Sequence, residues 1–304
     1  MRLLTRSDFD GLACGALLKA LGVIDSWKFV HPKDLQDGLV EVDENDILAN
    51  VPYVSGCGMW FDHHSSEGER LGKNLAFKGE SRPADSAARV IYDYYDGKQR
   101  LPHFEEMVLA ADKVDAAKLT AEEILNPSGW VLLGFIMDPR TGLGRFREFR
   151  ISNYALMEEL MEACRTQNIS EILQNADVKE RVELYLDQDA KFREMVKVRT
   201  TVYGNAIVTD LRGVETIYAG NRFLIYSLYP QQNISLWVVD GRGKQNCPIA
   251  IGHSVLNRTS KTNVGALCLK YGGGGHPQVG TCQVDYADAD RCIAEIVSEI
   301  NADG

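Results

Sequence analysis

The sequence has little positive charge, no long apolar run and no paired cysteines, and each shortage excludes a class of protein. Lysine and arginine number 33 against 43 aspartates and glutamates, which gives a net charge of −10. Such a chain does not coat nucleic acid through bulk electrostatics. The longest strongly apolar run, residues 130–137, is far too short to span a bilayer. A phosphate-rich ligand would therefore need local cations or metal ions to offset the acidic residues.

The cysteines and the N-terminal residues indicate the compartment. Seven cysteines are scattered without any Cys-x-x-Cys pair, which predicts reduced thiols and a cytoplasmic protein. Residues 1–6 lack the apolar core of a signal peptide. With 304 residues, of which 45% are hydrophobic and 25% charged, the chain is long enough for about two globular domains.

Short apolar segments alternate with helical patterns over the first half of the chain. This alternation is typical of an α/β domain with a doubly wound, mainly parallel sheet, which we expect over residues 1–150. We expect strands at 1–5, 27–30, 47–49 and 59–61, and helices at 12–21, 83–95, 104–114 and 130–137.

The second half begins with charged helices and then becomes rich in β-strand patterns. Helices expected at 152–167 and 177–199 predict a helical connector over 151–199, because the second of them is charged over much of its surface. From residue 200 we expect a smaller α/β domain that ends at residue 304. Its strands are expected at 205–211, 223–229, 234–239 and 248–253, and its closing helix at 287–300.

Polar side chains that suit a metal ion follow three of the first four predicted strands. Asp8 and Asp10 come after the first, Asn50 after the third, and residues 62–64 (Asp-His-His) after the fourth. Because the carboxyl ends of parallel strands share one crevice, these side chains are expected to meet. Imidazole and carboxylate are ligands for Mn and related metals. The alternatives are that Asp10 caps a helix while Asp8 is solvated, and that the histidines lie in a surface turn.

A second candidate site lies near the C-terminus, where residues 272–276 read Gly-Gly-Gly-Gly-His. Successive glycines permit positive φ and allow backbone N–H groups to approach and hold an anion. A plain hinge is the alternative reading. Arg258 is a candidate phosphate clamp, because its planar fork matches phosphate oxygens; the alternative is an exposed loop arginine.

Three motifs in this order resemble the DHH phosphoesterase family with its DHH-associated C-terminal domain. They are Asp8-x-Asp10-Gly11, the Asp-His-His at 62–64 and the glycine run at 272–276, and the resemblance covers nearly the whole chain. Relatives include RecJ-like exonucleases, short-oligonucleotide and cyclic-dinucleotide phosphodiesterases, and exopolyphosphatase-related proteins. The resemblance implies a metal-binding catalytic domain over 1–150 and a substrate- and phosphate-binding domain over 200–304.

The implied function is metal-dependent hydrolysis of a phosphate-rich substrate in the cleft between the two domains. The substrate would be polyphosphate, a short single-stranded oligonucleotide or a related nucleotide, and not long duplex DNA. We expect neither a membrane nor long duplex DNA as a partner. Whether the protein forms a homodimer is left open. The alternative function is a phosphate- or nucleotide-binding protein of the same fold that has lost hydrolysis.

The resemblance also implies the ligands of a Mn²⁺ or Mg²⁺ site. By position, Asp8 and Asp10 are ligands from the first motif, and His63 is the ligand from the Asp-His-His motif. The carboxylate of the fourth motif falls at Asp112, with Asp115 as the alternative.

Other residues take catalytic and substrate-binding roles in the same comparison. Asp62 would orient the site and His64 would lie nearer the substrate phosphate. Together with Arg258, the phosphate-holding residues would be Gly273, Gly274, Gly275 and His276.

Two substitutions depart from the family pattern and bear on the number of metal ions. Arg6 stands where the family has histidine, and Asn50 stands where it has aspartate. Losing a divalent ion removes two positive charges, while the added arginine and the lost carboxylate restore them. We therefore expect one ion rather than two, with Arg6 as a partial catalytic stand-in. In the alternative, Arg6 points to solvent and Asp46 or Asp62 supplies the missing carboxylate.

A third departure follows His276. The family often has two alanines and a glycine after this histidine, whereas residues 277–281 of this chain read Pro-Gln-Val-Gly-Thr.

Overall fold

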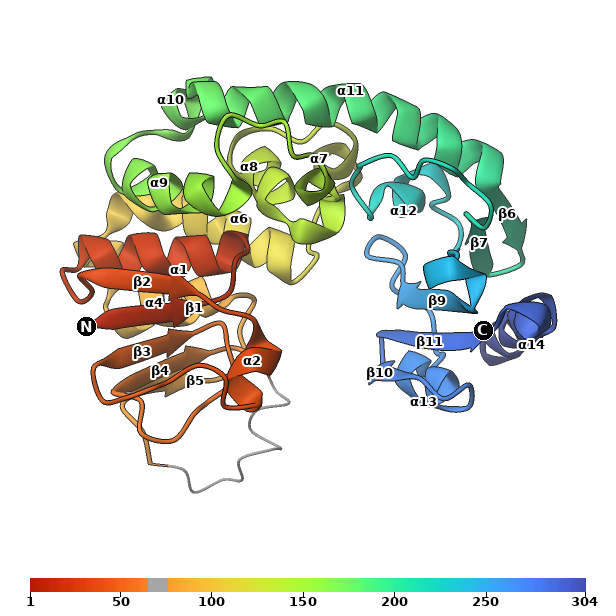
Figure 1. The fold of residues 1–304 in the computed structure, drawn as a ribbon, viewed down its shortest axis with the longest axis horizontal. Helices are drawn as coiled ribbons and strands as arrows, with labels where there is room; N and C mark the ends of the chain where they lie inside the picture. Colours follow the sequence, from red (N-terminus) through yellow and green to blue (C-terminus); the bar gives the residue numbers. More distant parts are fainter. Residues whose placement is uncertain (65–75) are drawn as a thin grey trace. The chain divides into compact units, whose positions relative to one another are not determined.

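The computed structural model describes residues 1–64 and 76–304, and it divides the chain into two compact units (Figure 1). Unit 1 comprises Met1–Lys118 and Pro127–Leu184, and unit 2 comprises Leu119–Asn126 and Tyr185–Gly304. Each unit contains a β-sheet with helices packed against it. The predicted α/β class is confirmed.

Unit 1 is built on a five-stranded parallel sheet with the order β2-β1-β3-β4-β5. Because β1 lies between β2 and β3, the chain changes direction across the sheet at this point. Ligands of open α/β sheets bind outside the carboxyl ends of the strands at such a switch point. The strands are β1 (Arg2–Thr5), β2 (Ser26–Phe29), β3 (Asp46–Ala49), β4 (Met59–Asp62) and β5 (Gly79–Ser81).

Different elements cover the two faces of this sheet. On one face, Leu4 and Trp60 share an apolar cluster with Leu35 of the short helix α2. On the other face α1 is buried along most of its length and packs against α4, α6 and α9. A β-carbon on Gly15 of α1 would lie 2.3 Å from the sulfur of Met161 in α9, so small residues in α1 allow this close approach.

The helices described within residues 1–64 and 76–199 include each of those predicted there. They are α1 (Phe9–Ala20), α2 (Pro32–Gln36), α4 (Ala87–Tyr94), α5 (Gly97–Arg100), α6 (Glu105–Asp115), α7 (Ala121–Leu125), α8 (Gly129–Met137), α9 (Asn153–Thr166), α10 (Ile169–Gln174) and α11 (Ala176–Arg199). Short 3-10 helices occupy Pro102–Phe104, Pro139–Thr141 and Leu143–Arg145.

The segment predicted as a connector, 151–199, is divided between the units. Helices α9 and α10 lie in unit 1, and α11 continues across the boundary after Leu184. The fully buried Arg181 of α11 donates to Asn153 Oδ1 and to the Ile151 carbonyl, and its guanidinium lies 4.0 Å from the ring centroid of Phe149. These contacts hold the start of α11 against unit 1. Although α11 is the longest helix described, neither it nor any other helix in residues 1–64 and 76–304 is both long and apolar enough to cross a membrane.

Unit 2 contains a six-stranded mixed sheet with the order β10-β11-β9-β8-β7-β6, in which the β7–β8 pairing is parallel and the others are antiparallel. The strands are β6 (Thr200–Tyr203), β7 (Ala206–Asp210), β8 (Ile234–Val238), β9 (Asn246–His253), β10 (Gly274–His276) and β11 (Val279–Asp285). The helices are α12 (Leu224–Leu228), α13 (Val264–Leu269) and α14 (Ala289–Asp303), with 3-10 turns at Arg242–Lys244 and Tyr286–Asp288.

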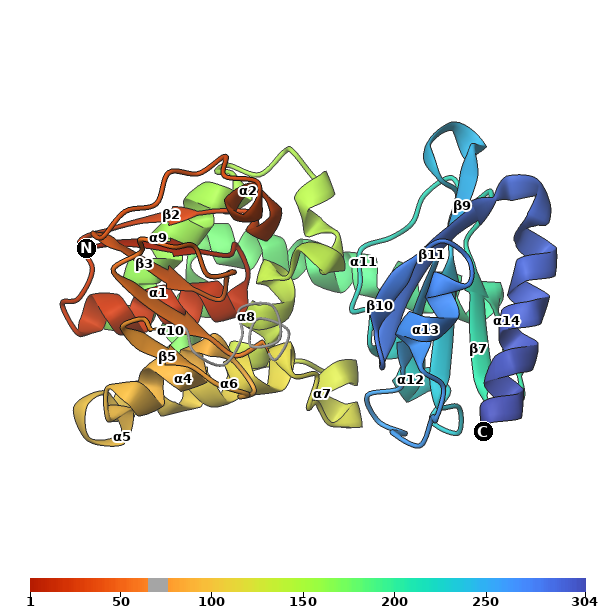
Figure 2. The same cartoon turned by 90° about the horizontal axis from the view of Figure 1, so that it is seen from below.

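The core of unit 2 joins one face of this sheet to α13 and α14. Leu236 and Ile249 of the sheet share an apolar cluster with Leu267 of α13 and Ile296 of α14. Figure 2 shows α14 running beside β7. All seven cysteines of the chain are free thiols, and six of them are buried.

The predicted strand at 223–229 is wrong, because residues 224–228 form the helix α12. Leu224, Ile225 and Tyr226 are all buried, and a short apolar run does not distinguish a buried strand from a buried helical turn. The side chain of Asn221 accepts from the Phe223 N–H just before the helix, a local bond that favours the helical turn.

Candidate metal centre

The turn between β1 and α1 is fixed by a buried aspartate and a glycine. Asp8 is the N-cap of α1, and its Oδ1 accepts from the Gly11 N–H at 2.9 Å. A β-carbon on Gly11 would lie 2.0 Å from the Arg6 carbonyl oxygen. Only glycine therefore allows the helix to start this close to the end of β1.

Asp8 also contacts the two residues that depart from the family pattern. Its Oδ1 accepts from Asn50 Nδ2 at 3.0 Å, and its Oδ2 lies 3.2 Å from Arg6 Nε. Asn50 follows β3 with φ of +56°, a left-handed conformation that asparagine tolerates better than most residues. Burial raises the pKa of the Asp8 carboxyl, and the Arg6 charge opposes this rise.

Asp10 points away from its own helix and caps a different one. Its two carboxylate oxygens accept from the backbone N–H groups of Ala87 and Ala88 at 2.9 and 2.8 Å, at the start of α4. Burial raises the pKa of Asp10 well above its usual range, and the charges of Asp115 and Asp8 add to the rise. The alternative in which Asp10 caps the following helix and Asp8 is solvated is wrong, because Asp8 is buried and caps α1 whereas Asp10 binds the start of α4.

His63 brings an imidazole nitrogen up to two carboxylates. Its Nδ1 lies 3.2 Å from the Ala84 carbonyl oxygen. Its Nε2 lies 3.2 Å from Asp115 Oδ2 and 3.8 Å from Asp10 Oδ2. The ligand atoms of Asp10, His63 and Asp115 all lie within 4.8 Å of one another. We call these three residues the metal cluster.

The metal cluster fits a divalent cation. A carbonyl oxygen only accepts, so the contact with Ala84 places the His63 proton on Nδ1 and leaves a lone pair on Nε2. That Nε2 is buried and has no hydrogen-bond partner among the described residues. A cation between this lone pair and the two carboxylates would offset their mutual repulsion. One imidazole and two carboxylates are a donor set that suits Mn²⁺.

Asp62 and His64 form a hydrogen-bonded pair beside the metal cluster. His64 Nδ1 lies 2.8 Å from Asp62 Oδ1, and this bond raises the pKa of His64. The other oxygen of Asp62 is buried without a hydrogen-bond partner among the described residues. Ligand atoms of Asp62, His63 and His64 also lie within 4.8 Å of one another, so Asp62 adds a further carboxylate next to His63.

The two candidates for the fourth-motif carboxylate have different surroundings. Asp112 accepts from Ser86 Oγ at 2.7 Å and from Arg89 Nε and Nη2 at 2.9 and 2.8 Å. Asp115, three residues later in α6, lies in the metal cluster. The structure therefore brings together Asp10, His63 and the alternative Asp115, and it places Asp112 in an ion pair that supports α4.

This difference gives a direct test. Asp115→Asn is expected to lower Mn²⁺ affinity at least about tenfold, because it removes a charged ligand, and 1.4 kcal/mol corresponds to a factor of ten. Asp112→Asn is expected to keep the Mn²⁺ affinity and to lower the melting temperature, since a charge-assisted hydrogen bond contributes about 1.5–3 kcal/mol. Calorimetric titration and thermal unfolding of both variants measure these effects. Loss of Mn²⁺ binding in Asp112→Asn alone would return the ligand role to Asp112.

The predicted phosphate-holding residues lie in unit 2. The glycine run ends in β10, an edge strand whose Gly274 and His276 pair with Thr281 and Val279 of β11. An edge strand keeps one side of its backbone unpaired within the sheet. Arg258 lies between β9 and α13, and its Nε donates to the Val255 carbonyl at 3.1 Å.

The glycines of this run differ in what surrounds them. A β-carbon on Gly273 would lie 2.1 Å from the Thr281 carbonyl oxygen, and one on Gly275 would lie 2.3 Å from the Val279 carbonyl oxygen. A β-carbon on Gly274 would meet no described atom within 4 Å. Gly273 and Gly275 are thus needed for packing, whereas Gly274 faces open space.

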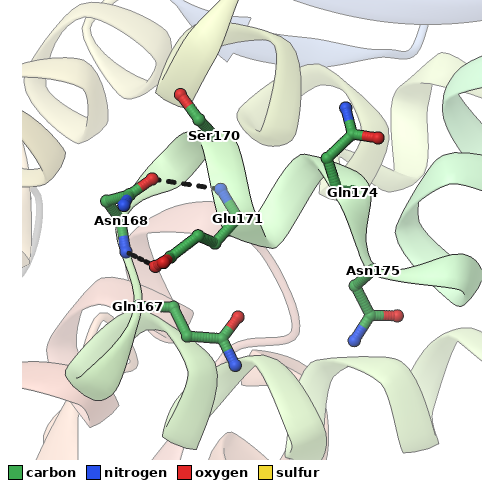
Figure 3. Close-up of a pocket in the computed structure, with 6 residues that line it drawn as sticks. All are labelled: Gln167, Asn168, Ser170, Glu171, Gln174 and Asn175. Carbon is green, nitrogen blue, oxygen red and sulfur yellow. Dashed lines mark hydrogen bonds between the residues drawn. The ribbon is translucent and has the colours of Figure 1, made fainter.

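A hollow of about 580 Å³ beside α10 is separate from these residues (Figure 3). It is lined by Gln167, Asn168, Ser170, Glu171, Gln174 and Asn175. Asn168 and Glu171 already bond to each other's backbone N–H groups in a capping box. The hollow contains none of the metal cluster, so it is not the candidate site.

Sequence reasoning missed the groups that hold the candidate ligands in place. The carbonyl of Ala84 orients His63, and the N–H groups of Ala87 and Ala88 hold Asp10. Ser86 and Arg89 donate hydrogen bonds to the carboxylate of Asp112. Backbone atoms carry no sequence signal, and only the Ser86 position, as a typical N-cap residue before a helix, could have been noticed.

No protein-family model and no curated protein matches the chain. Among solved structures, the pGpG-specific phosphodiesterase PggH from Vibrio cholerae is 49% identical, with a TM-score of 0.90, and the match covers 100% of this chain and 99% of that one. The DHH domain of a protein assigned to a family of ribosomal proteins is 12% identical, with a TM-score of 0.57, over 99% of this chain and 86% of that one. The chain belongs to the DHH-type phosphoesterase family.

A more distant structure agrees in fold. RecJ from Thermus thermophilus, solved in complex with Mn²⁺, is 13% identical with a TM-score of 0.52. The match covers 98% of this chain and 52% of RecJ. The DHH-type resemblance predicted from the three motifs, and with it the phosphoesterase class, is confirmed.

Proposed function

We propose that this DHH-type protein is a divalent-metal-dependent phosphodiesterase that hydrolyses pGpG, a 5′-phosphorylated dinucleotide. The observation that carries the proposal is the 49% identity over the full chain to a pGpG-specific phosphodiesterase. Addition of one water across the internal phosphodiester breaks one P–O bond and yields two molecules of guanosine monophosphate. A dinucleotide is the shortest of the single-stranded oligonucleotides that the sequence predicted.

In this proposal Asp10, His63 and Asp115 hold one Mn²⁺ or Mg²⁺ ion. The ion would polarise a phosphoryl oxygen and lower the pKa of a bound water. The protein contributes by fixing the ligands, since Ala84 orients His63 and the start of α4 holds both oxygens of Asp10. Mn²⁺ in the RecJ structure supports this choice of ion.

His64 is the proposed phosphate contact beside the metal cluster. Its Nδ1 is bonded to the buried Asp62, so Nε2 is left to meet the substrate. The raised pKa of His64, caused by that bond, favours the charged imidazolium, which donates to a phosphate oxygen. In unit 2, the backbone at Gly274 and the guanidinium of Arg258 are the proposed contacts for a second phosphate.

A binding protein without hydrolysis is the second candidate. It is favoured by Arg6 and Asn50, because both contact the carboxylate of Asp8. These contacts leave Asp8 unable to serve as a metal ligand. The two candidates agree on binding and differ in turnover.

Turnover of pGpG with Mn²⁺ is the deciding measurement, with guanosine monophosphate followed by chromatography. We expect hydrolysis that EDTA abolishes, and much slower or no hydrolysis of polyphosphate, a cyclic dinucleotide and long duplex DNA. The duplex should also bind poorly, because the net charge of −10 repels it. Binding of pGpG without product would favour the second candidate. Tight, salt-sensitive binding of the duplex would contradict both.

A further inference from the structure

The carboxylate of Asp8 already has a full set of protein partners. Oδ1 accepts from the Gly11 N–H at 2.9 Å and from Asn50 Nδ2 at 3.0 Å. Oδ2 lies 3.2 Å from Arg6 Nε. Asp8 is 7% exposed, so a buried negative charge is held by one cation and two neutral donors. A metal ion at Asp8 would have to displace the guanidinium.

We propose that Arg6 is the second cation of this site. It neutralises Asp8 and binds a phosphate oxygen of the substrate, next to a single divalent ion held by Asp10, His63 and Asp115. The phosphate-binding part rests on the function proposed above, whereas the number of metal ions does not.

The charges of the site agree with one ion. With Asp8 paired to Arg6, the carboxylates that face His63 Nε2 are those of Asp10 and Asp115. Their two negative charges match one divalent cation. A second divalent ion would be placed against the positive charge of Arg6.

Arg6 is placed to use its remaining donors. Its side chain is 43% exposed, and among residues 1–64 and 76–304 its one ionic partner is Asp8. The contact with that carboxylate is through Nε at 3.2 Å, and a guanidinium can bind a phosphate through two parallel hydrogen bonds of its other N–H groups. Arg140, whose charge also reaches Asp8, is itself held by Asp138 at 2.7 Å. Arg6 contacts Asp8 directly and is therefore the guanidinium that we assign to the phosphate.

Asn50 completes the arrangement. Its amide N–H donates to Asp8, which a carboxylate at position 50 could not do. An aspartate there would add a negative charge beside Asp8 and would itself require a cation. The pair Arg6 and Asn50 therefore acts together, so exchanging both should create a second metal position.

Metal stoichiometry tests the number of ions. We expect calorimetric titration of the full chain with Mn²⁺ to give one ion per chain for the wild type and two for Arg6→His/Asn50→Asp. Electron paramagnetic resonance should show coupling between two Mn²⁺ ions in the double variant only. Two ions in the wild type would overturn the proposal. So would a single ion in the double variant once circular dichroism shows that it is folded.

Binding of inorganic phosphate in the presence of Mg²⁺ tests the guanidinium itself. Arg6→Gln is expected to weaken phosphate binding at least about tenfold, the effect of losing a charge-assisted hydrogen bond. Arg165→Gln is the matched control, since its side chain is 40% exposed and pairs with Glu162 on α9; its affinity should not change. Equal phosphate affinity in Arg6→Gln and the wild type would overturn the role of Arg6.

The proposed function and this inference can fail separately. Hydrolysis of pGpG is measured on the same wild-type protein. One ion in the wild type and two in the double variant, without any turnover, would remove the proposed hydrolysis and keep Arg6 as the second cation. Turnover with two ions in the wild type would keep the proposed hydrolysis and remove Arg6 as the second cation.

Discussion

Replacing His63 by alanine is expected to abolish Mn²⁺ binding and to lower pGpG hydrolysis at least about a thousandfold, since a metal ion supplies several kcal/mol of charge stabilisation and 1.36 kcal/mol corresponds to a factor of ten. The fold should remain. The imidazole has one hydrogen bond in the described structure, to the Ala84 carbonyl, and its Nε2 has none. The melting temperature of His63→Ala should therefore stay close to that of the wild type.

Asp10→Ala is the informative contrast to His63→Ala. It removes a proposed metal ligand, and it also leaves the buried N–H groups of Ala87 and Ala88 without their acceptor. Each unpaired buried group costs about 1–3 kcal/mol, so this variant should lose both Mn²⁺ binding and thermal stability. Asp10→Asn, which keeps one acceptor oxygen, should lose less stability than Asp10→Ala. Calorimetry and thermal unfolding separate the two effects, and wild-type Mn²⁺ binding in His63→Ala would exclude the metal cluster.

The convergence of the candidate ligands could be predicted from the sequence, because it follows from sheet topology. Asp8 and Asn50 follow β1 and β3, and Asp62 ends β4, so the carboxyl ends of a parallel sheet bring these residues to one edge. That argument needs only the strand pattern. It gives the neighbourhood of the site but not the hydrogen bonds of each side chain.

The sequence could not decide between Asp112 and Asp115. The two are three residues apart on α6 and so lie on neighbouring parts of one helix surface. In the structure, Arg89 on another helix pairs with Asp112, which leaves Asp115 as the proposed ligand. Similarly, nothing near Asp10 in the sequence indicates that its carboxylate caps α4, 77 residues away. Tertiary contacts that involve backbone groups leave no pattern in the sequence.

The glycine run shows the same limit at a finer scale. The sequence presents four identical residues, and steric freedom predicts an anion-holding backbone for all of them. The structure separates them by what a side chain would meet. Gly273 and Gly275 have backbone carbonyls against them, and Gly274 has open space.

Gly274→Val is therefore expected to weaken binding of phosphate ligands at least about tenfold, the equivalent of 1.4 kcal/mol, with little change in melting temperature. The added side chain would occupy the space through which a phosphate reaches the backbone of β10, and no described atom lies within 4 Å of its β-carbon. Isothermal titration with pGpG under EDTA, which prevents turnover, measures the affinity.

Gly273→Val is the matched control, because it lies one residue away and should fail for the opposite reason. Its β-carbon would lie 2.1 Å from the Thr281 carbonyl oxygen and 2.6 Å from the Cα of Cys282, so β11 would have to move. Forcing extra atoms into a packed region costs about 1–3 kcal/mol, and the melting of unit 2 should fall accordingly. If Gly274→Val binds pGpG as tightly as the wild type, the run is a structural turn. If both variants lose stability equally, the open space at Gly274 is not what distinguishes the two glycines.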